Sequence, residues 1–155
     1  KQQKLYELIQ IKNKFLGIEE QEHSLINLVD YHNAEMKNVL EWGTLKNHHT
    51  TRKYIAMSLK QKLKKSDVFL SQLNYKFLMD FEKFLREHQP TDHQKPCRQN
   101  TIMKHIARLR KIINMALKYE WIEKDPFIKF KPHYIRKDRE FLSKNEKTIE
   151  LDFKN

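Results

Sequence analysis

The sequence predicts an all-α fold, a four-helix bundle with a leading helix before it and a basic segment after it. The 155-residue chain has 2 glycines and 4 prolines, so it encodes few turns. Apolar residues recur in several segments at the i, i+3, i+4 spacing of amphipathic helices. Polar residues that commonly cap helices stand before four of these segments. Long helices with few connections suit this pattern better than an α/β enzyme with glycine-rich turns.

The first two predicted helices differ in how regularly their apolar residues are spaced. Residues 1–17 form a short helix ended by Gly17, with a loose repeat of Leu5, Leu8, Ile9 and Leu16. We therefore expect a lead-in element outside the core. Residues 24–40 form a second helix capped by Ser24, and its buried stripe consists of Leu25, Leu28, Val29, His32 and Met36.

Three further helices complete the predicted bundle. Thr44 is expected to cap the third helix, residues 45–63, and Asn74 the fourth, residues 75–88. The fourth helix carries Phe77, Phe81, Phe84 and Leu85 on one face. Asn100 is expected to cap the fifth helix, which ends before Asp125-Pro126 and has the apolar row Ile102, Ile106, Leu109, Ile113 and Ala116. Trp42 and Trp121 flank helix ends and are expected at the edges of the core.

The positive charge of the chain is concentrated on two of these helices. The formal net charge is +11, which favours an anionic partner. Residues 19–41 hold six acids and one base, whereas residues 44–65 hold seven bases and no acid. Residues 100–120 hold five bases and one acid. The basic residues also form rows at helical spacing: Lys46, Lys53 and Lys60 on one helix, and Lys104, Arg108 and Lys111 on the other.

A single basic row is often no more than a solvated helix face. Two such rows beside an acidic helix are less ordinary, because surface charges usually mix in sign. Duplex DNA offers dense phosphates and a major groove that admits a helix. A membrane surface would instead favour large apolar side chains beside the basic row, and here these occupy core positions.

Other classes of site find little support in the sequence. A single cysteine, Cys97, excludes an internal disulfide framework and suits a reducing compartment. His88, His93 and Cys97 do not have the spacing of a zinc site. Neither a glycine-rich phosphate loop nor a nucleophile elbow occurs, and no apolar run is long enough to span a membrane. We expect no metal, cofactor or small-molecule substrate. The start at Lys1 fits a fragment as well as a processed chain.

Three stretches together resemble the core-binding domain of tyrosine recombinases, with integrases of bacterial mobile elements as the nearest likeness. They are WGTLKNHHTTRKYIAMSLKQKL, LSQLNYKFLMDFEKFLRE and NTIMKHIARLRKIINMALKYEWIEKDPF. DREFLS, residues 138–143, resembles the start of the catalytic domain of that family. The resemblance divides the chain into a linker helix (1–21) after an arm-binding domain, a core-binding bundle (22–127) and an interdomain linker with the start of a catalytic domain (128–155).

The resemblance implies that the two basic helices face duplex DNA at a recombination site, in the bacterial cytoplasm and beside further recombinase protomers. The catalytic Arg/Lys/His cluster and the nucleophilic Tyr of the family belong to the later domain, so we expect no catalytic residue here. The residues expected to contact DNA, by charge and position, are Thr44, Lys46, Arg52, Lys53, Lys60, Lys104, Arg108, Lys111, Lys129, Lys131 and Arg136. The alternative is a helical interaction or dimerisation domain of a DNA-associated regulator.

Overall fold

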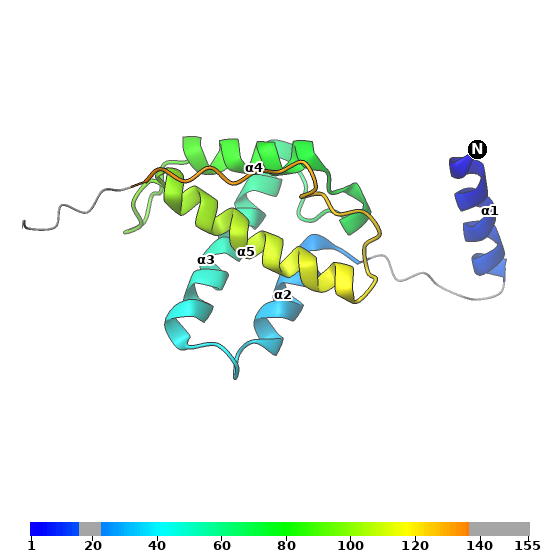
Figure 1. Cartoon of the computed structure of the whole chain (residues 1–155), viewed down its shortest axis with the longest axis horizontal. Helices are drawn as coiled ribbons and strands as arrows, with labels where there is room; N and C mark the ends of the chain where they lie inside the picture. Colours follow the sequence, from blue (N-terminus) through cyan, green and yellow to red (C-terminus); the bar gives the residue numbers. More distant parts are fainter. Residues whose placement is uncertain (16–22, 137–155) are drawn as a thin grey trace, which may run out of the picture.

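The computed structural model of the chain describes residues 1–15 and 23–136, and over these residues it is helical (Figure 1). Its α-helices are α1 (Gln2–Phe15), α2 (Leu25–Glu35), α3 (Trp42–Ser58), α4 (Tyr75–Glu87) and α5 (Gln99–Lys118). A π-helical turn, Leu59–Leu63, extends α3, and a 3-10 turn, Leu70–Gln72, precedes α4. Within the described residues, β-pairing is limited to an isolated bridge between Ser24 and Phe69. The predicted all-α fold is confirmed.

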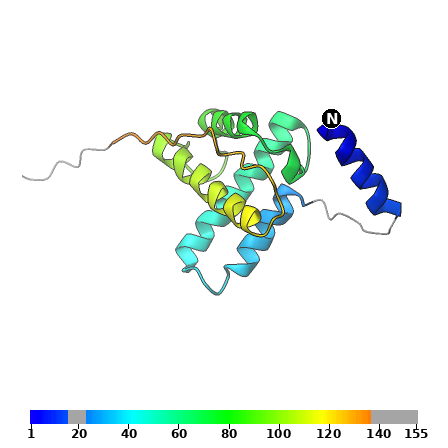
Figure 2. The ribbon, with the colours of Figure 1, turned by 45° about the vertical axis from the view of Figure 1, so that its right-hand side comes forward.

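Helices α2 to α5 form the bundle. The hairpin of α2 and α3 lies below α4, and α5 crosses the hairpin diagonally (Figures 1 and 2). All four helices contribute to one apolar core, whose largest fully buried side chains include Phe81, Phe84, Ile106 and Leu109. The apolar row predicted for the fifth helix is confirmed, since all five of its residues are buried. A shared core of this kind is what stabilises short amphipathic helices in water.

The boundary between the second and third helices differs from the prediction. Helix α2 ends at Glu35, not at residue 40, and residues 36–40 turn the chain back. Two helices that pack as a hairpin need such a non-helical reversal between them. Met36 is only half-buried because it lies at the start of this turn. Trp42 then opens α3 at 70% exposure, so the expectation that it lies at the core edge is wrong.

The predicted helix caps are partly right. Asn74 caps α4, because its side-chain oxygen accepts a hydrogen bond from the amide of Phe77 at 2.9 Å. Thr44 does not cap α3, whose N-cap is Glu41, and Thr44 is an exposed residue of the first turn. Asn100 does not cap α5, whose N-cap is Arg98. The side chain of Asn100 is instead bonded to the segment that follows the bundle.

Two flanking segments complete the described chain. Helix α1 stands at one end of the molecule, apart from the bundle, and its residues Leu5, Leu8 and Ile9 are exposed, as expected for a lead-in element (Figure 1). Its end at Phe15 precedes the predicted stop at Gly17, and residues 16–22 lie outside the described residues. After α5, Phe127 and Phe130 are buried and anchor residues 128–136, which we call the strap; it begins in a turn and continues without regular secondary structure from residue 130.

Candidate nucleic-acid interface

A row of cations follows α5 where this helix crosses α3. Lys104 and Lys111 are exposed, and Arg108 lies between them. These three residues, spaced by four and three, share one face of the helix and form what we call the α5 basic row. The opposite face is fully buried in the core through Leu109 and Ile113. The row is therefore held rigidly, because the apolar face fixes the rotation of the helix.

The spacing of the row suggested an exposed Arg108. The side chain is instead half-buried in a polar seam between α3 and α5. The seam consists of Arg108, Thr51 and His105. The hydroxyl of Thr51 lies 2.8 Å from Nδ1 of His105. Nη1 of Arg108 lies 3.3 Å from the Thr51 hydroxyl and 3.3 Å from the same ring nitrogen. Arg108 is half-buried because α3 packs against the flank of α5 on which it lies.

The histidine of this seam is neutral. Nδ1 faces a guanidinium donor and a hydroxyl, so it serves as an acceptor and the ring proton belongs on Nε2. Burial, together with the charge of Arg108, lowers the pKa of His105 to about 4. Burial also lowers the pKa of Arg108, although a guanidinium remains charged at every physiological pH. The seam therefore holds one positive charge at neutral pH, and it belongs to Arg108.

A pair of buried histidines also lies close to the α5 basic row. The rings of His32 on α2 and His48 on α3 are 4.8 Å apart between centroids, and both side chains are buried. Burial, then His32, Arg108 and Lys111, lowers the pKa of His48 to about 4. Burial also lowers the pKa of His32. His48 thus lies at the seam between α2 and α3, while the adjacent His49 is exposed.

On α3, two of the predicted contact residues are paired with acids. Arg52 donates from Nε and Nη2 to the carboxylate of Asp30 on α2, at 2.9 and 3.2 Å. Lys53 donates to Asp92, in the loop before α5, at 2.6 Å. The hydrogen bond with Asp30 is the main cause of the raised pKa of Arg52. The hydrogen bond with Lys53 is the main cause of the lowered pKa of Asp92. The guanidinium of Arg52 would have to break its two hydrogen bonds with Asp30 before it could pair with a base.

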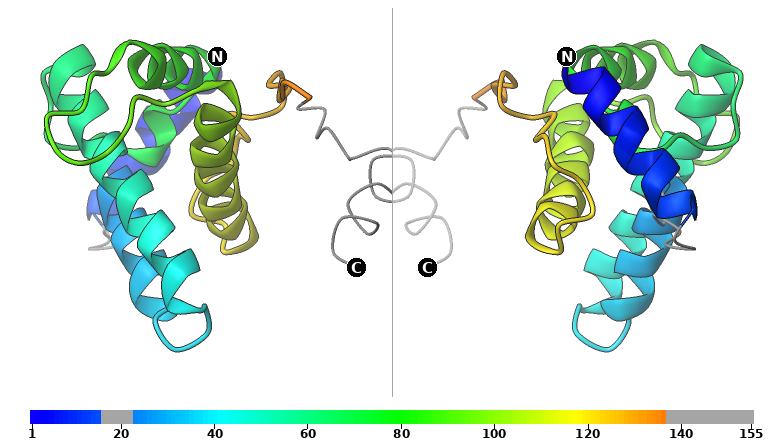
Figure 3. Two further views of the ribbon diagram at one scale, coloured as in Figure 1. Left: turned by 90° about the vertical axis from the view of Figure 1, so that its left-hand side faces the viewer. Right: turned by 90° about the vertical axis from the view of Figure 1, so that its right-hand side faces the viewer.

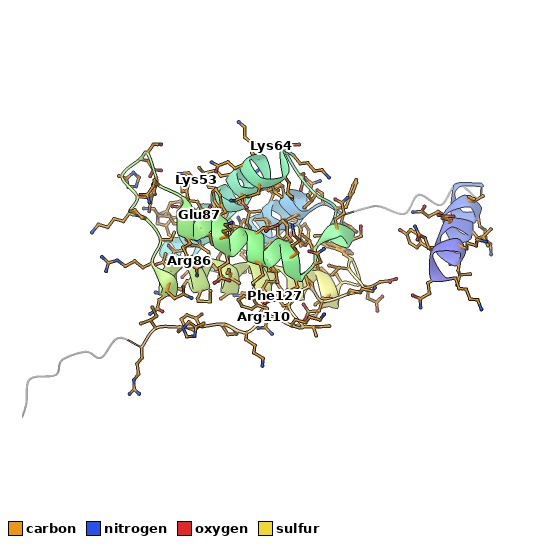
Figure 4. The ribbon with its side chains drawn as sticks, turned by 90° about the horizontal axis from the view of Figure 1, so that it is seen from above. Lys53, Lys64, Arg86, Glu87, Arg110 and Phe127 are labelled. Carbon is orange, nitrogen blue, oxygen red and sulfur yellow. The ribbon has the colours of Figure 1, made fainter. Side chains whose placement is uncertain are left out.

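The remaining α3 cations lie along the exposed side of the helix. Lys46 is exposed near its start, and Lys60 is exposed in the π-helical turn. A π turn has wider spacing than an α-helix, so Lys60 departs from the straight row that a spacing of seven would give. Lys64, which follows in the left-handed conformation, ends the helical segment and projects from it in Figure 4.

The strap is fixed to the first turn of α5 by side-chain amides. Nδ2 of Asn100 donates to the carbonyl of Ile135 at 2.8 Å, and Oδ1 accepts from the amide of the same residue at 2.8 Å. Nε2 of Gln99 donates to the carbonyl of His133 at 2.8 Å. We call these three hydrogen bonds the amide clamp. From residue 130 the strap has no regular secondary structure, and the clamp defines its course along α5.

The clamp brings the end of the strap next to the α5 basic row. Asn100 and Lys104 are four residues apart and share a face of α5, so the exposed Arg136 joins this side. The exposed Lys129 and Lys131 lie on another flank of α5. There Phe127 packs under the guanidinium of Arg110 at 5.7 Å, and Figure 4 shows the two side by side. In Figure 3 the strap and α3 flank α5 on different sides.

The structure thus groups the predicted contact residues into three sets. Lys104, Arg108, Lys111 and Arg136 share the α5 face; Thr44, Lys46, Arg52, Lys53 and Lys60 follow α3; Lys129 and Lys131 lie on the strap. Sequence analysis missed Thr51 and His105, which hold Arg108, and Gln99 and Asn100, which hold the strap. His105 did give a signal, since it is a polar residue between Lys104 and Ile106 at a core position of the helix.

A comparison with protein-family models fits this architecture. The model of the phage integrase SAM-like domain matches residues 24–132, well over half of the chain. The chain belongs to the phage integrase SAM-like domain family. This family identifies it as an N-terminal SAM-like domain of a tyrosine recombinase, as the resemblance implied. The match begins at the N-cap of α2 and ends within the strap, so it covers the whole bundle. No curated protein and no solved structure gives a match.

Two other features are absent from the part of the chain that the structure describes. Over residues 1–15 and 23–136, no three His, Cys, Asp or Glu side chains come together in a way that could hold a metal ion. In the same part of the chain, no helix has the length and hydrophobicity to cross a membrane. The segment predicted to begin a catalytic domain, residues 138–143, lies outside the described residues.

Proposed function

We propose that this SAM-like domain binds duplex DNA as the core-binding part of a site-specific tyrosine recombinase. The observation that carries the proposal is the α5 basic row, in which Arg108 is oriented by Thr51 and His105 and flanked by exposed Lys104 and Lys111. A guanidinium held in place loses little side-chain entropy on contact with a phosphate or a base. Lysine-rich surroundings favour phosphate contacts, which position a protein without reading sequence.

In the proposed complex the α5 face and the α3 side have different roles. The α5 basic row, joined by Arg136, supplies the first set of cations. Within the described residues, no acid forms an ion pair with Lys104 or Lys111. Arg52 and Lys53 exchange Asp30 and Asp92 for phosphates when DNA arrives. The domain holds the recombination site, and strand cleavage belongs to a catalytic domain that carries the Arg/His/Tyr set. The 155-residue chain should therefore neither cut nor relax supercoiled plasmid.

The test is a salt titration of DNA binding with matched charge variants. If the chain neutralises ~6 phosphates, log K should fall with log salt at a slope of about −5. The double variant Lys104→Ala/Lys111→Ala should weaken binding and reduce the slope by about 2. The control, Lys76→Ala/Lys83→Ala, removes the same charge from exposed positions on α4 and should change binding far less. Binding that is absent at low salt, or insensitive to salt, would favour a protein-interaction domain instead.

A further inference from the structure

The outer face of α3 carries ring-bearing and basic side chains in alternation. Trp42, Lys46, His49 and Lys53 are all exposed, and their spacings of four, three and four residues place them on one side of the helix. Thr51 makes a hydrogen bond to α5, and Lys53 lies two residues, or roughly 200°, further round α3. This row, which we call the α3 outer face, is therefore turned away from the α5 basic row.

A pocket of about 550 Å³ opens beside the α3 outer face, between α2 and α3. It is lined by Trp42, Leu45 and His49 from α3 and by Asp30, Asn33 and Lys37 from α2, among others. The carboxylate of Asp30 is already bonded to Arg52, whereas the ammonium of Lys37 is exposed. A recess of this volume lies within the range of small-ligand sites, so it is large enough for a nucleobase.

The floor of this pocket holds a polar atom without a partner. Asn33 is 5% exposed, and its Oδ1 accepts a hydrogen bond from Nδ1 of His32 at 3.1 Å, because an amide oxygen can only accept. The amide nitrogen Nδ2 is then the remaining donor, and within the described residues it forms no hydrogen bond. A buried donor that lacks an acceptor is costly, so an acceptor oxygen in the pocket would be stabilising.

Trp42 gives this surface a second feature that the bundle itself does not use. Its side chain is 70% exposed at the first residue of α3, and the space beside Gly43 is open. Duplex DNA would engage the lysines through its phosphates, but it keeps the faces of its bases inside the stack. The unpaired bases of a single strand can stack on an exposed indole while lysines hold the adjoining phosphates. A single strand therefore accounts for the rings as well as for the charges.

We propose that the α3 outer face binds single-stranded DNA. One base stacks on Trp42 at the pocket, and a carbonyl oxygen of that base accepts a hydrogen bond from Nδ2 of Asn33. Lys37 and Lys46 lie on either side of Trp42 along the chain and contact the phosphates. The inference goes beyond the proposed duplex binding, because it assigns a different form of DNA to a different face of the bundle.

The test uses the 155-residue chain and a fluorescently labelled oligothymidine of about 20 nucleotides, whose bases carry carbonyl oxygens and do not pair with one another. Fluorescence anisotropy should show binding, and Trp42→Ala should raise the dissociation constant at least about tenfold. Tyr75→Ala is the matched control, because Tyr75 is also an exposed aromatic residue that opens a helix. It should leave the dissociation constant unchanged.

Tryptophan fluorescence reports the stacking itself. Bound oligothymidine should quench the emission of the unchanged chain. Trp42→Phe keeps an aromatic ring, so it should retain most of the affinity but lose the quenching, since Trp121 lies at another pocket. Quenching that persists in Trp42→Phe would overturn the proposal.

Two pairs of lysines distinguish this site from the α5 basic row. Lys104→Ala/Lys111→Ala should weaken the binding of oligothymidine no more than Lys76→Ala/Lys83→Ala, which removes the same charge from α4. The proposal fails if oligothymidine does not bind, if Trp42→Ala binds it as well as the unchanged chain, or if the α5 variant selectively loses it. A 20-base-pair duplex measured in parallel judges the proposed function separately, and Trp42→Ala should bind that duplex normally.

Discussion

At the scale of single residues, Arg108 and Leu109 are neighbours with opposite tasks. Leu109 is fully buried, and Leu109→Ala should destabilise the bundle by about 2–5 kcal/mol through the cavity it leaves. Arg108→Ala removes hydrogen bonds to Thr51 and His105, so it should cost about 0.5–1.5 kcal/mol, in contrast to a freely exposed residue. Urea unfolding measures both, with Lys104→Ala as an exposed control that should stay within about 0.5 kcal/mol.

The same variants separate binding from folding. Under the proposed function, Arg108→Ala should weaken DNA binding by roughly 1–3 kcal/mol if the guanidinium contacts a base. Leu109→Ala should weaken it only in proportion to the unfolded fraction. Should Arg108→Ala leave DNA binding unchanged in a folded domain, the α5 basic row would not be the contact surface.

His105 makes the stability of the bundle dependent on pH. The unfolded chain takes up a proton on this residue near pH 6.5, whereas the folded chain does so only near the lowered pKa of about 4. The stabilisation is therefore fully present above pH 6.5 and is lost as the pH falls from 6.5 toward 4, by an amount on the order of 3 kcal/mol. His48, whose pKa is also lowered to about 4, adds to the loss over the same range.

Urea unfolding at pH 7.5 and at pH 5 measures this dependence. The variant His105→Asn should flatten it without abolishing it, because His48 still titrates. His93 is exposed and serves as the control, so His93→Asn should leave the difference between the two pH values unchanged. Equal pH dependence in His105→Asn and the unchanged chain would contradict a neutral buried His105.

At the scale of elements, the strap depends on the amide clamp. Asn100→Ala removes both hydrogen bonds to the backbone of Ile135. The strap should then leave α5 more often, and trypsin should cleave faster after its exposed residue Lys129. Asn114→Ala is the matched control, because Asn114 is exposed on the same helix, away from the clamp. Equal cleavage of the two variants would mean that Phe127 and Phe130 alone hold the strap.

DNA should act on the strap in the opposite direction. Its basic residues follow the phosphate backbone in the proposed complex, so added duplex should slow cleavage in the unchanged chain. Cleavage that is equal with and without DNA would separate the strap from the contact surface and leave the α5 basic row as the remaining candidate.

At the scale of the whole molecule, the charge pairs on α3 set how much of the net charge is available to a ligand. Asp30 and Asp92 neutralise Arg52 and Lys53 across element boundaries. Asp30→Asn/Asp92→Asn should therefore strengthen DNA binding at low salt and steepen its salt dependence. Exposed ion pairs contribute little to stability, so the melting temperature should change little.

The control for each single change, Asp30→Asn or Asp92→Asn, removes one negative charge from another helix. Asp80 is paired with Lys76 at 3.6 Å on α4. Asp80→Asn should affect DNA binding less than either α3 variant, since α4 lies outside the proposed contact surface. If all these changes act alike, DNA responds to net charge alone, and the placement of the cations on α3 has no special part in binding.

The sequence by itself determined the helices, the buried face of α5 and the two basic segments. Apolar spacing is a local property, and it dictates which side of a helix leaves water: Ile102, Ile106 and Leu109 are buried as their spacing predicts. Asn74 was found as a cap because the bond that it accepts from Phe77 spans a single turn. Features that depend on neighbours within one helical turn can be read from the chain alone.

Only the tertiary structure decided which cations are free and which are held. Arg52 meets Asp30 across 22 residues of sequence, Lys53 meets Asp92 across 39, and Arg108 meets Thr51 across 57. Asn100 has the residue type of a cap, yet it binds a backbone 35 residues away. Such pairings depend on how helices cross, and the crossing is set by the packing of the whole core. Charge counted along one helix therefore located the basic surface, while its partners came from other elements.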